Sequence, residues 1–188
     1  AAANDPKVLE VRVALIDLLI DQGKFAEAIP QLEKRLVKND ALRPEVLERL
    51  GKDTNFTAAE LKDLMSKMSR QKSILNALSK GYLAAKDGTQ QRLISAINLA
   101  FILYYHHPKD KKHDAEYIEY LLRYAQAQYE YGVDFGNPQA LDNVIALLKQ
   151  GVVIMGLLET YEQTVPGTEK QITDLIENAE RERGKQRF

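Results

Sequence analysis

The chain has 188 residues and a formal net charge of −1, which suits one domain or one short helical array that buries roughly 70% of its unfolded surface. It has no cysteine, and this excludes a disulfide framework, a cysteine-based zinc site and a thiol nucleophile. The near-neutral charge argues against a nucleic-acid partner, and no apolar run reaches the ~20 residues that cross a bilayer.

The first residues, AAANDP, fit the remnant of a processed precursor and an expression scar equally well. We therefore expect a soluble protein, and its compartment stays open between cytoplasmic, periplasmic and secreted.

The first predicted element is a helix from about Pro6 to Gln22. Asp5 is a suitable N-cap, Pro6 suits the first helical position, and Gly23 ends the helix. The apolar residues that recur at helical spacing are Leu9, Val13, Ile16 and Ile20, with Leu15 and Leu19 beside them.

A second helix is predicted from Phe25 to about Lys38. Its apolar positions are Phe25, Ala28, Ile29, Leu32 and Leu36, and Pro30 should weaken its first turns. A short third helix begins near Arg43-Pro44 and ends at Gly51.

The first two helices resemble a unit of the tetratricopeptide repeat family over residues 8–41. The resemblance rests on Leu15, Leu19, Gly23, Phe25, Ala28 and Leu32. In that family, a small residue at the turn and an aromatic residue after it let two antiparallel helices pack closely. Ile16, Arg35 and Asp40 depart from the family pattern.

The resemblance implies a helical hairpin that binds peptides in a concave groove. Glu10, Val13 and Asp17 would face that groove, although they are not the Lys/Asn pattern with which the family clamps a C-terminal carboxylate. No second unit is found in register, and about three repeats are needed for a stable array. The later helices are therefore either degenerate repeats or a non-repeating bundle.

The middle of the chain begins with a clear helix start. Thr57 and Glu60 form a predicted capping box, and Phe56 and Leu61 occupy the positions of a hydrophobic staple. The apolar pattern continues to about Lys86, and we predict a break near residues 69–71 because mean helices are nearer ~12 residues.

The segment 89–107 is predicted to be a central helix against which the others pack. From Leu93 to Tyr105 only Ser95 and Asn98 are polar, and a helix that is apolar all round belongs inside a domain. Pro108 cannot continue the helix.

The C-terminal helices are predicted over residues 114–183. Asp114 caps the first of them, which ends at Gly132. Asn137-Pro138 begins a long helix to about Gln163, in which Gly151 and Gly156 indicate close approach of another backbone. Thr168 and Gln171 form a predicted capping box for the last helix.

These elements predict a single all-α domain over residues 1–188 with eight or nine helices. It begins with a tetratricopeptide-like hairpin at 6–40, and the whole is either a hairpin array or an irregular helical bundle.

Two groups of side chains are candidates for a site. The histidines His106, His107 and His113 lie near Asp110, and imidazole and carboxylate groups bind divalent metals. The spacing is not that of a helical metal motif, and capping and interaction with the helix dipole explain these residues more simply.

The other candidate is a stripe of tyrosines. Tyr117, Tyr120 and Tyr124 share one face of a helix, and tyrosine is favoured in binding surfaces. The simpler interpretation is that their rings lie at the edge of the core with the hydroxyls in water.

The chain shows no catalytic triad motif, no phosphate-binding glycine loop and no paired-carboxylate site. We therefore predict a non-catalytic adaptor that needs no cofactor and binds another protein through Glu10, Val13, Asp17 and the tyrosine stripe. The alternatives are a bundle that binds a small ligand or a metal at the 106–114 loop, and a structural subunit of a larger assembly or oligomer.

Overall fold

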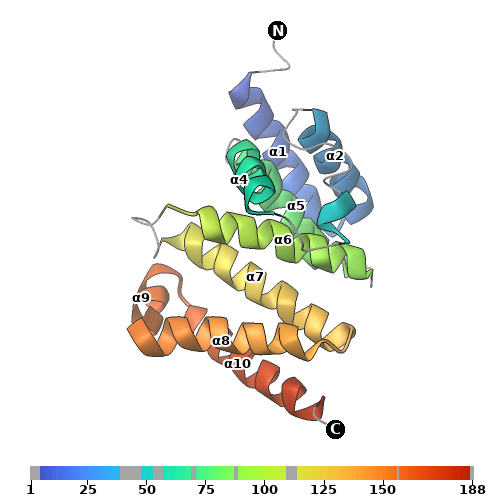
Figure 1. The fold of residues 1–188 in the computed structure, drawn as a ribbon. Helices are drawn as coiled ribbons and strands as arrows, with labels where there is room; N and C mark the ends of the chain where they lie inside the picture. Colours follow the sequence, from blue (N-terminus) through green and yellow to red (C-terminus); the bar gives the residue numbers. More distant parts are fainter. Residues whose placement is uncertain are drawn as a thin grey trace. The chain divides into compact units, whose positions relative to one another are not determined.

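The computed structural model describes residues 5–38, 48–52, 57–68, 71–86, 89–108, 114–155 and 157–186. These residues include nine helices with given bounds, a further helical segment at 48–50 and no strand, which confirms the predicted all-α class (Figure 1). None of these helices is long and apolar enough to cross a membrane. The chain separates into two compact units, Ala1–His106 and His107–Phe188. That the whole chain is one domain stays a prediction.

Unit 1 contains the helices α1 (Pro6–Asp21), α2 (Phe25–Lys38), α4 (Ala58–Met68), α5 (Lys72–Ala85) and α6 (Gln90–His106). The predicted break between α4 and α5 is confirmed, because α4 ends at Met68 and α5 begins at Lys72. Of the expected third helix, the described residues include only 48–50, which are helical. Phe56 and the side chain of Leu61 lie outside the described residues, so the staple is not described.

The helix α5 packs against α1, α2 and α6. Its Gly81 allows this close approach, since a Cβ atom there would lie 3.1 Å from Ile20 Cδ1 and 3.4 Å from Ile29 Cγ1. Leu99 and Ile102 of α6 are buried, as the apolar segment predicts. In unit 1 it is nevertheless α5, rather than α6, that joins the hairpin of α1 and α2 to the rest.

The turn between α1 and α2 follows the sequence signals. The carboxylate of Asp5 accepts the N–H of Lys7 at 2.9 Å, which caps α1. Gly23 has φ of 75°, and its N–H donates to the carbonyl of Ile20 at 2.9 Å. Glycine reaches this left-handed conformation without steric cost, so the chain turns tightly into α2.

Unit 2 contains the helices α7 (Ala115–Asp134), α8 (Pro138–Met155), α9 (Leu157–Thr164) and α10 (Thr168–Lys185). In this unit α8 packs against α7, α9 and α10. Two expected boundaries were wrong. The helix α7 continues past Gly132 to Asp134, and the segment expected to be one helix to Gln163 comprises α8 and α9. The side chains around Gly151 and Gly156 lie outside the described residues.

The caps of α7 and α8 are those that the sequence predicts. Asp114 Oδ1 accepts the N–H of Tyr117 at 2.9 Å, and Asn137 Oδ1 accepts the N–H of Ala140 at 3.0 Å. Each bond satisfies a backbone donor that the first turn of a helix leaves without an intrahelical partner.

Candidate protein-binding surface

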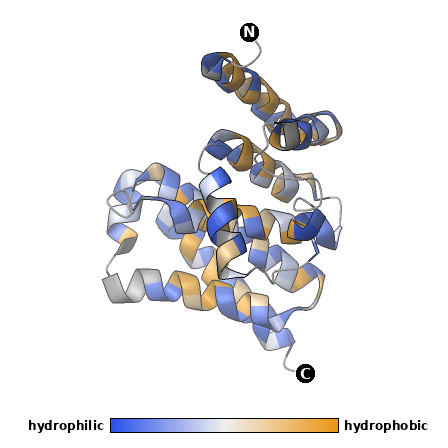
Figure 2. Ribbon diagram, turned by 45° about the horizontal axis from the view of Figure 1, so that its top comes forward, coloured by the Kyte–Doolittle hydropathy of each residue, from blue (hydrophilic) through white to orange (hydrophobic). Residues whose placement is uncertain are grey.

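The helix α1 is apolar on two opposite faces. Val13, Ile16 and Ile20 are 4%, 4% and 3% exposed and form its inner face. Val11, Leu15 and Leu18 are 60%, 58% and 53% exposed. With 3.6 residues per turn, these three project on the side opposite the inner face, and half-buried Val8 continues their row toward the N-terminus. We call Val8, Val11, Leu15 and Leu18 the α1 outer face. The ribbon in Figure 2 is coloured by hydropathy and shows that apolar residues recur along this helix.

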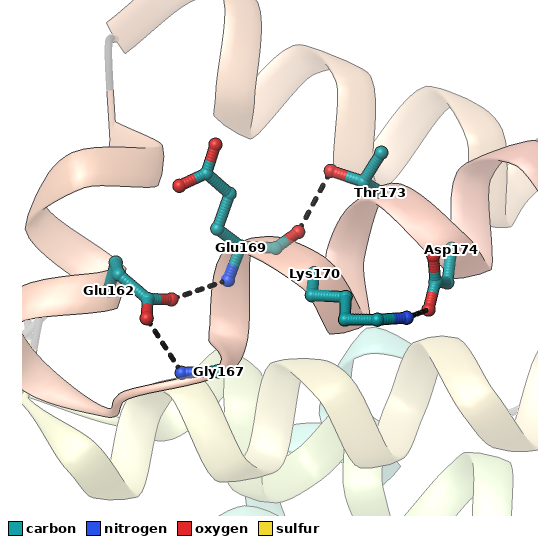
Figure 3. Close-up of a pocket in the computed structure, with 6 residues that line it drawn as sticks. All are labelled: Glu162, Gly167, Glu169, Lys170, Thr173 and Asp174. Carbon is teal, nitrogen blue, oxygen red and sulfur yellow. Dashed lines mark hydrogen bonds and ion pairs between the residues drawn. The ribbon is translucent and has the colours of Figure 1, made fainter.

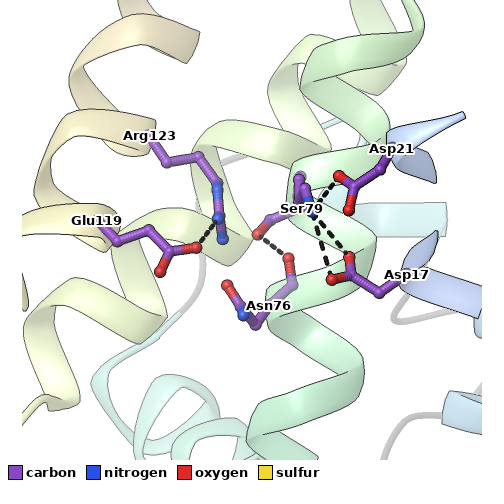
Figure 4. Close-up of polar contacts among 7 residues, drawn as sticks. Asp17, Asp21, Asn76, Ser79, Glu119 and Arg123 are labelled. Carbon is purple, nitrogen blue, oxygen red and sulfur yellow. Dashed lines mark hydrogen bonds and ion pairs between the residues drawn. The ribbon is translucent and has the colours of Figure 1, made fainter. Parts of the chain in front are cut away.

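Two carboxylates at the edge of α1 fix the helix on α5. Lys80 Nζ lies 3.2 Å from Asp17 Oδ1 and 2.7 Å from Asp21 Oδ1. Partial burial by itself lowers the pKa of Lys80, but the hydrogen bonds with Asp21 and Asp17 outweigh it and raise the pKa above its usual value. Figure 4 shows both aspartates turned toward this contact. The ion pairs thus help to hold α1 with its outer face in water.

The residues expected to face a groove do not form one exposed surface. Val13 belongs to the inner face and is buried, and Asp17 is half-buried and paired with Lys80. Glu10 is exposed. A role of these residues in partner binding stays a prediction, and Val13 offers almost no surface for it.

The tyrosine stripe of α7 is only partly accessible. Tyr120 is buried, whereas Tyr117 and Tyr124 are half-buried. Burial, together with the nearby charges of Glu116 and Glu119, raises the pKa of Tyr120. Binding by the stripe stays a prediction, and the burial of Tyr120 favours the simpler interpretation that these rings complete the core.

The histidine loop is described only in part, because Asp110 and His113 lie outside the described residues. His106 is exposed and His107 is buried. The Nε2 atom of His107 lies 2.9 Å from Asp114 Oδ1, and its ring centroid lies 5.8 Å from that of Tyr117. Among the described residues, no group of three or more histidines and carboxylates could hold a metal ion. His107 thus contacts Asp114, the residue that caps α7.

A shallow pocket lies at the start of α10, where a capping box was predicted from Thr168 and Gln171. That prediction was wrong, since Thr168 is the first residue of the helix and its hydroxyl donates to the carbonyl of Val165 at 2.5 Å. The carboxylate of Glu162, from α9, accepts the N–H groups of Gly167 and Glu169 at 2.8 and 3.0 Å (Figure 3). These two bonds lower the pKa of Glu162. Glu162 thus occupies the donors that an anion would use at this helix end.

The α1 outer face was not identified from the sequence, which placed Leu15 beside the core residues. Leu15 is instead mostly exposed. The signal that could have separated the two faces is the spacing of positions 8, 11, 15 and 18, which differs from the spacing of the buried positions 13, 16 and 20.

The outer face of α1 is thus the largest set of exposed apolar side chains on one helix in the described part of the chain. No protein-family model, curated protein or solved structure matches the chain.

Proposed function

We propose that the chain is a non-catalytic helical scaffold that binds another protein through the α1 outer face. The observation that carries this proposal is the exposure of Val11, Leu15 and Leu18 on one side of one helix. Single exposed apolar residues are ordinary, but a contiguous row of them is typical of an interaction site. Covering such a row stabilises a complex by ~25 cal/mol per Å² of apolar surface removed from water.

The shape of the surface favours a protein partner over a small molecule. Small ligands bind in concave pockets that enclose most of their surface. The outer face is a ridge along a helix of 16 residues, and a second helix can pack along such a ridge with its own apolar side chains. We therefore expect the partner to present an amphipathic helix.

The described residues give the alternative functions no separate support. His107 contacts Asp114, which already serves as the cap of α7. At the pocket beside α10, the carboxylate of Glu162 already accepts a backbone N–H of the helix start. A structural subunit would use the same α1 outer face in a permanent contact, so that alternative shares the surface proposed here.

The test places a photo-crosslinking amino acid at Leu15, and in a second chain at Ala84, an exposed position of α5. Both chains are irradiated in cells of the organism that makes the protein. We expect the Leu15 probe alone to form discrete protein adducts, and we expect Leu18→Asp in the same chain to abolish them. Equal adduct patterns at Leu15 and Ala84, or adducts that survive Leu18→Asp, would contradict the proposal.

A further inference from the structure

The α1 outer face has the residue spacing of a coiled-coil seam. Val8, Val11, Leu15 and Leu18 are separated by three, four and three residues, and Gln22 continues the series. This alternation is the heptad pattern by which two helices pack side by side, with each seam residue inserted between residues of the facing helix. The inner face keeps α1 packed on unit 1 through Val13, Ile16 and Ile20, so the seam is presented on a helix that is already folded.

Charged residues flank this seam in an order that selects one orientation. Lys7 and Asp21 lie on one flank, near opposite ends of the helix, and Arg12 lies on the other flank. A parallel second copy of α1 would bring Lys7 beside Arg12 of that copy, because flanking residues five positions apart meet in parallel pairs. An antiparallel second copy brings Lys7 beside Asp21 of that copy, and the two-fold symmetry forms this ion pair twice.

We infer that the α1 outer face binds the α1 outer face of a second copy of this chain, in antiparallel orientation, to form a two-fold symmetric dimer. The inference rests on the proposed function, because it names the protein that this face binds.

In this arrangement, the four residues of the α1 outer face form apolar layers with those of the second copy. Val8 packs against Leu18 of the second copy, and Val11 packs against Leu15 of the second copy, each contact occurring twice by symmetry. Lys7 is exposed and its ammonium group forms no ion pair within the described residues, so it is available for Asp21 of the second copy. Asp21 is exposed, and Lys80 keeps its contact with Asp17 if Asp21 turns outward.

Two features make this dimer weak. The two Arg12 side chains approach one another across the symmetry axis, and like charges in register oppose the association. The seam also has little more than two heptads, so its area falls at the low end of specific interfaces, below ~1,200 Å² in total. The expected dimer is therefore a concentration-dependent contact that dissociates at roughly tens of micromolar.

The test uses analytical ultracentrifugation of the full chain over a concentration series that reaches ~500 µM. We expect the wild type to show a monomer–dimer equilibrium, and we expect Lys7→Glu alone and Asp21→Lys alone to weaken it at least ~10-fold, since each variant places like charges together twice. In an equimolar mixture of the two variants, a heterodimer pairs the introduced glutamate with the introduced lysine and the native Lys7 with the native Asp21, so dimers should return. A wild type that stays monomeric over the series, or a mixture that stays as monomeric as its components, would overturn the inference.

Matched controls carry the same charge changes away from the seam. Lys24→Glu and Glu27→Lys alter exposed residues that lie outside the seam and its flanks, so each should dimerise like the wild type, alone and mixed. Arg12→Gln removes the opposing arginine pair and should tighten the dimer by roughly several-fold. Circular dichroism of every variant checks that Asp21→Lys leaves the helices folded. Equal weakening in the controls would mean that net charge, rather than the seam, governs association, and this too would overturn the inference.

The crosslinking result separates this inference from the proposed function. A monomeric chain whose Leu15 probe is joined to a different protein would refute the dimer and leave the scaffold function standing. A monomeric chain whose Leu15 probe gives no specific adduct would refute both.

Discussion

At the scale of single residues, Glu60 joins a local helix start to a contact between distant segments. The side-chain oxygen Oε2 of Glu60 accepts a hydrogen bond from the backbone N–H of Thr57 at 2.8 Å. The backbone N–H of Glu60 donates in return to Thr57 Oγ1 at 3.2 Å. The other oxygen, Oε1, lies 2.7 Å from Arg49 Nη1. The predicted capping box is therefore confirmed, and the ion pair with Arg49 is an addition that local spacing does not indicate.

These contacts predict an unusually acidic carboxyl group. The hydrogen bond from Arg49, followed by those from Thr57, lowers the pKa of Glu60 from 4.5 to about 2. Because the folded pKa is below the unfolded one, the stabilisation is complete above about pH 4.5 and is lost as the pH falls toward about 2. We expect an NMR titration of the Glu60 carboxyl to give a midpoint near 2, and Arg49→Gln to raise it.

The control for this titration is Lys67→Gln. It removes a cation from the same helix, α4, where Lys67 Nζ lies 2.9 Å from Asp63 Oδ2. This change should leave the Glu60 midpoint in place. A Glu60 midpoint near 4.5 in the wild type would show that the contact with Arg49 is not formed in solution.

At the scale of helices, the sequence predicted those caps whose two partners lie within a few residues. Asp5, Thr57, Asp114 and Asn137 each bond to a backbone N–H two or three residues away, which residue order alone can indicate. The start of α10 failed this rule, since its cap is Glu162 from the preceding helix. The spacing of Thr168 and Gln171 in the sequence is the same whether or not a carboxylate from another helix already accepts the backbone N–H groups at the helix start.

The contact between α7 and α8 gives a second prediction, at Gly132. A Cβ atom there would lie 2.7 Å from Leu141 Cδ2 and 3.2 Å from the carbonyl oxygen of Asn137. Leu141 is fully buried and has little room to move. We expect Gly132→Ala to lower the free energy of unfolding by ~1–3 kcal/mol, because this strain exceeds the ~1 kcal/mol that alanine gains over glycine in a helix.

The matched control is Gly184→Ala in α10, where a Cβ atom would meet nothing within 4 Å. This variant should be neutral or more stable by up to ~1 kcal/mol, because only the helix propensity changes. Urea denaturation of both variants beside the wild type measures the difference. A Gly132→Ala chain as stable as the Gly184→Ala chain would show that α7 and α8 are not packed this closely.

At the scale of the whole molecule, the all-α class and most helix positions followed from apolar periodicity, but the choice of neighbours did not. The apolar stripe of α1 has two sides, and only the packing of α2 and α5 decides that Ile16 is buried and Leu15 is exposed. That packing depends on Gly81, which lies far from α1 in the chain. Residue patterns give the faces of a helix, whereas the long-range contacts decide which face remains for a partner.

The division of the chain predicts that residues 107–188 fold without the rest. The core of this unit combines side chains from α7, α8, α9 and α10; among them, Ile118, Leu141, Tyr161 and Ile172 are almost completely buried. A segment of this size can bury about 60% of its unfolded surface, which suffices for a stable domain without disulfides. We expect the segment to show a helical circular dichroism spectrum and a cooperative melt.

Leu141→Ala should remove ~2–5 kcal/mol of the stability of this segment, whereas Asn143→Ala, at an exposed position of the same helix, should change it by under ~0.5 kcal/mol. A segment that is unfolded, or one that melts without cooperativity, would show that unit 2 needs residues 1–106 in order to fold.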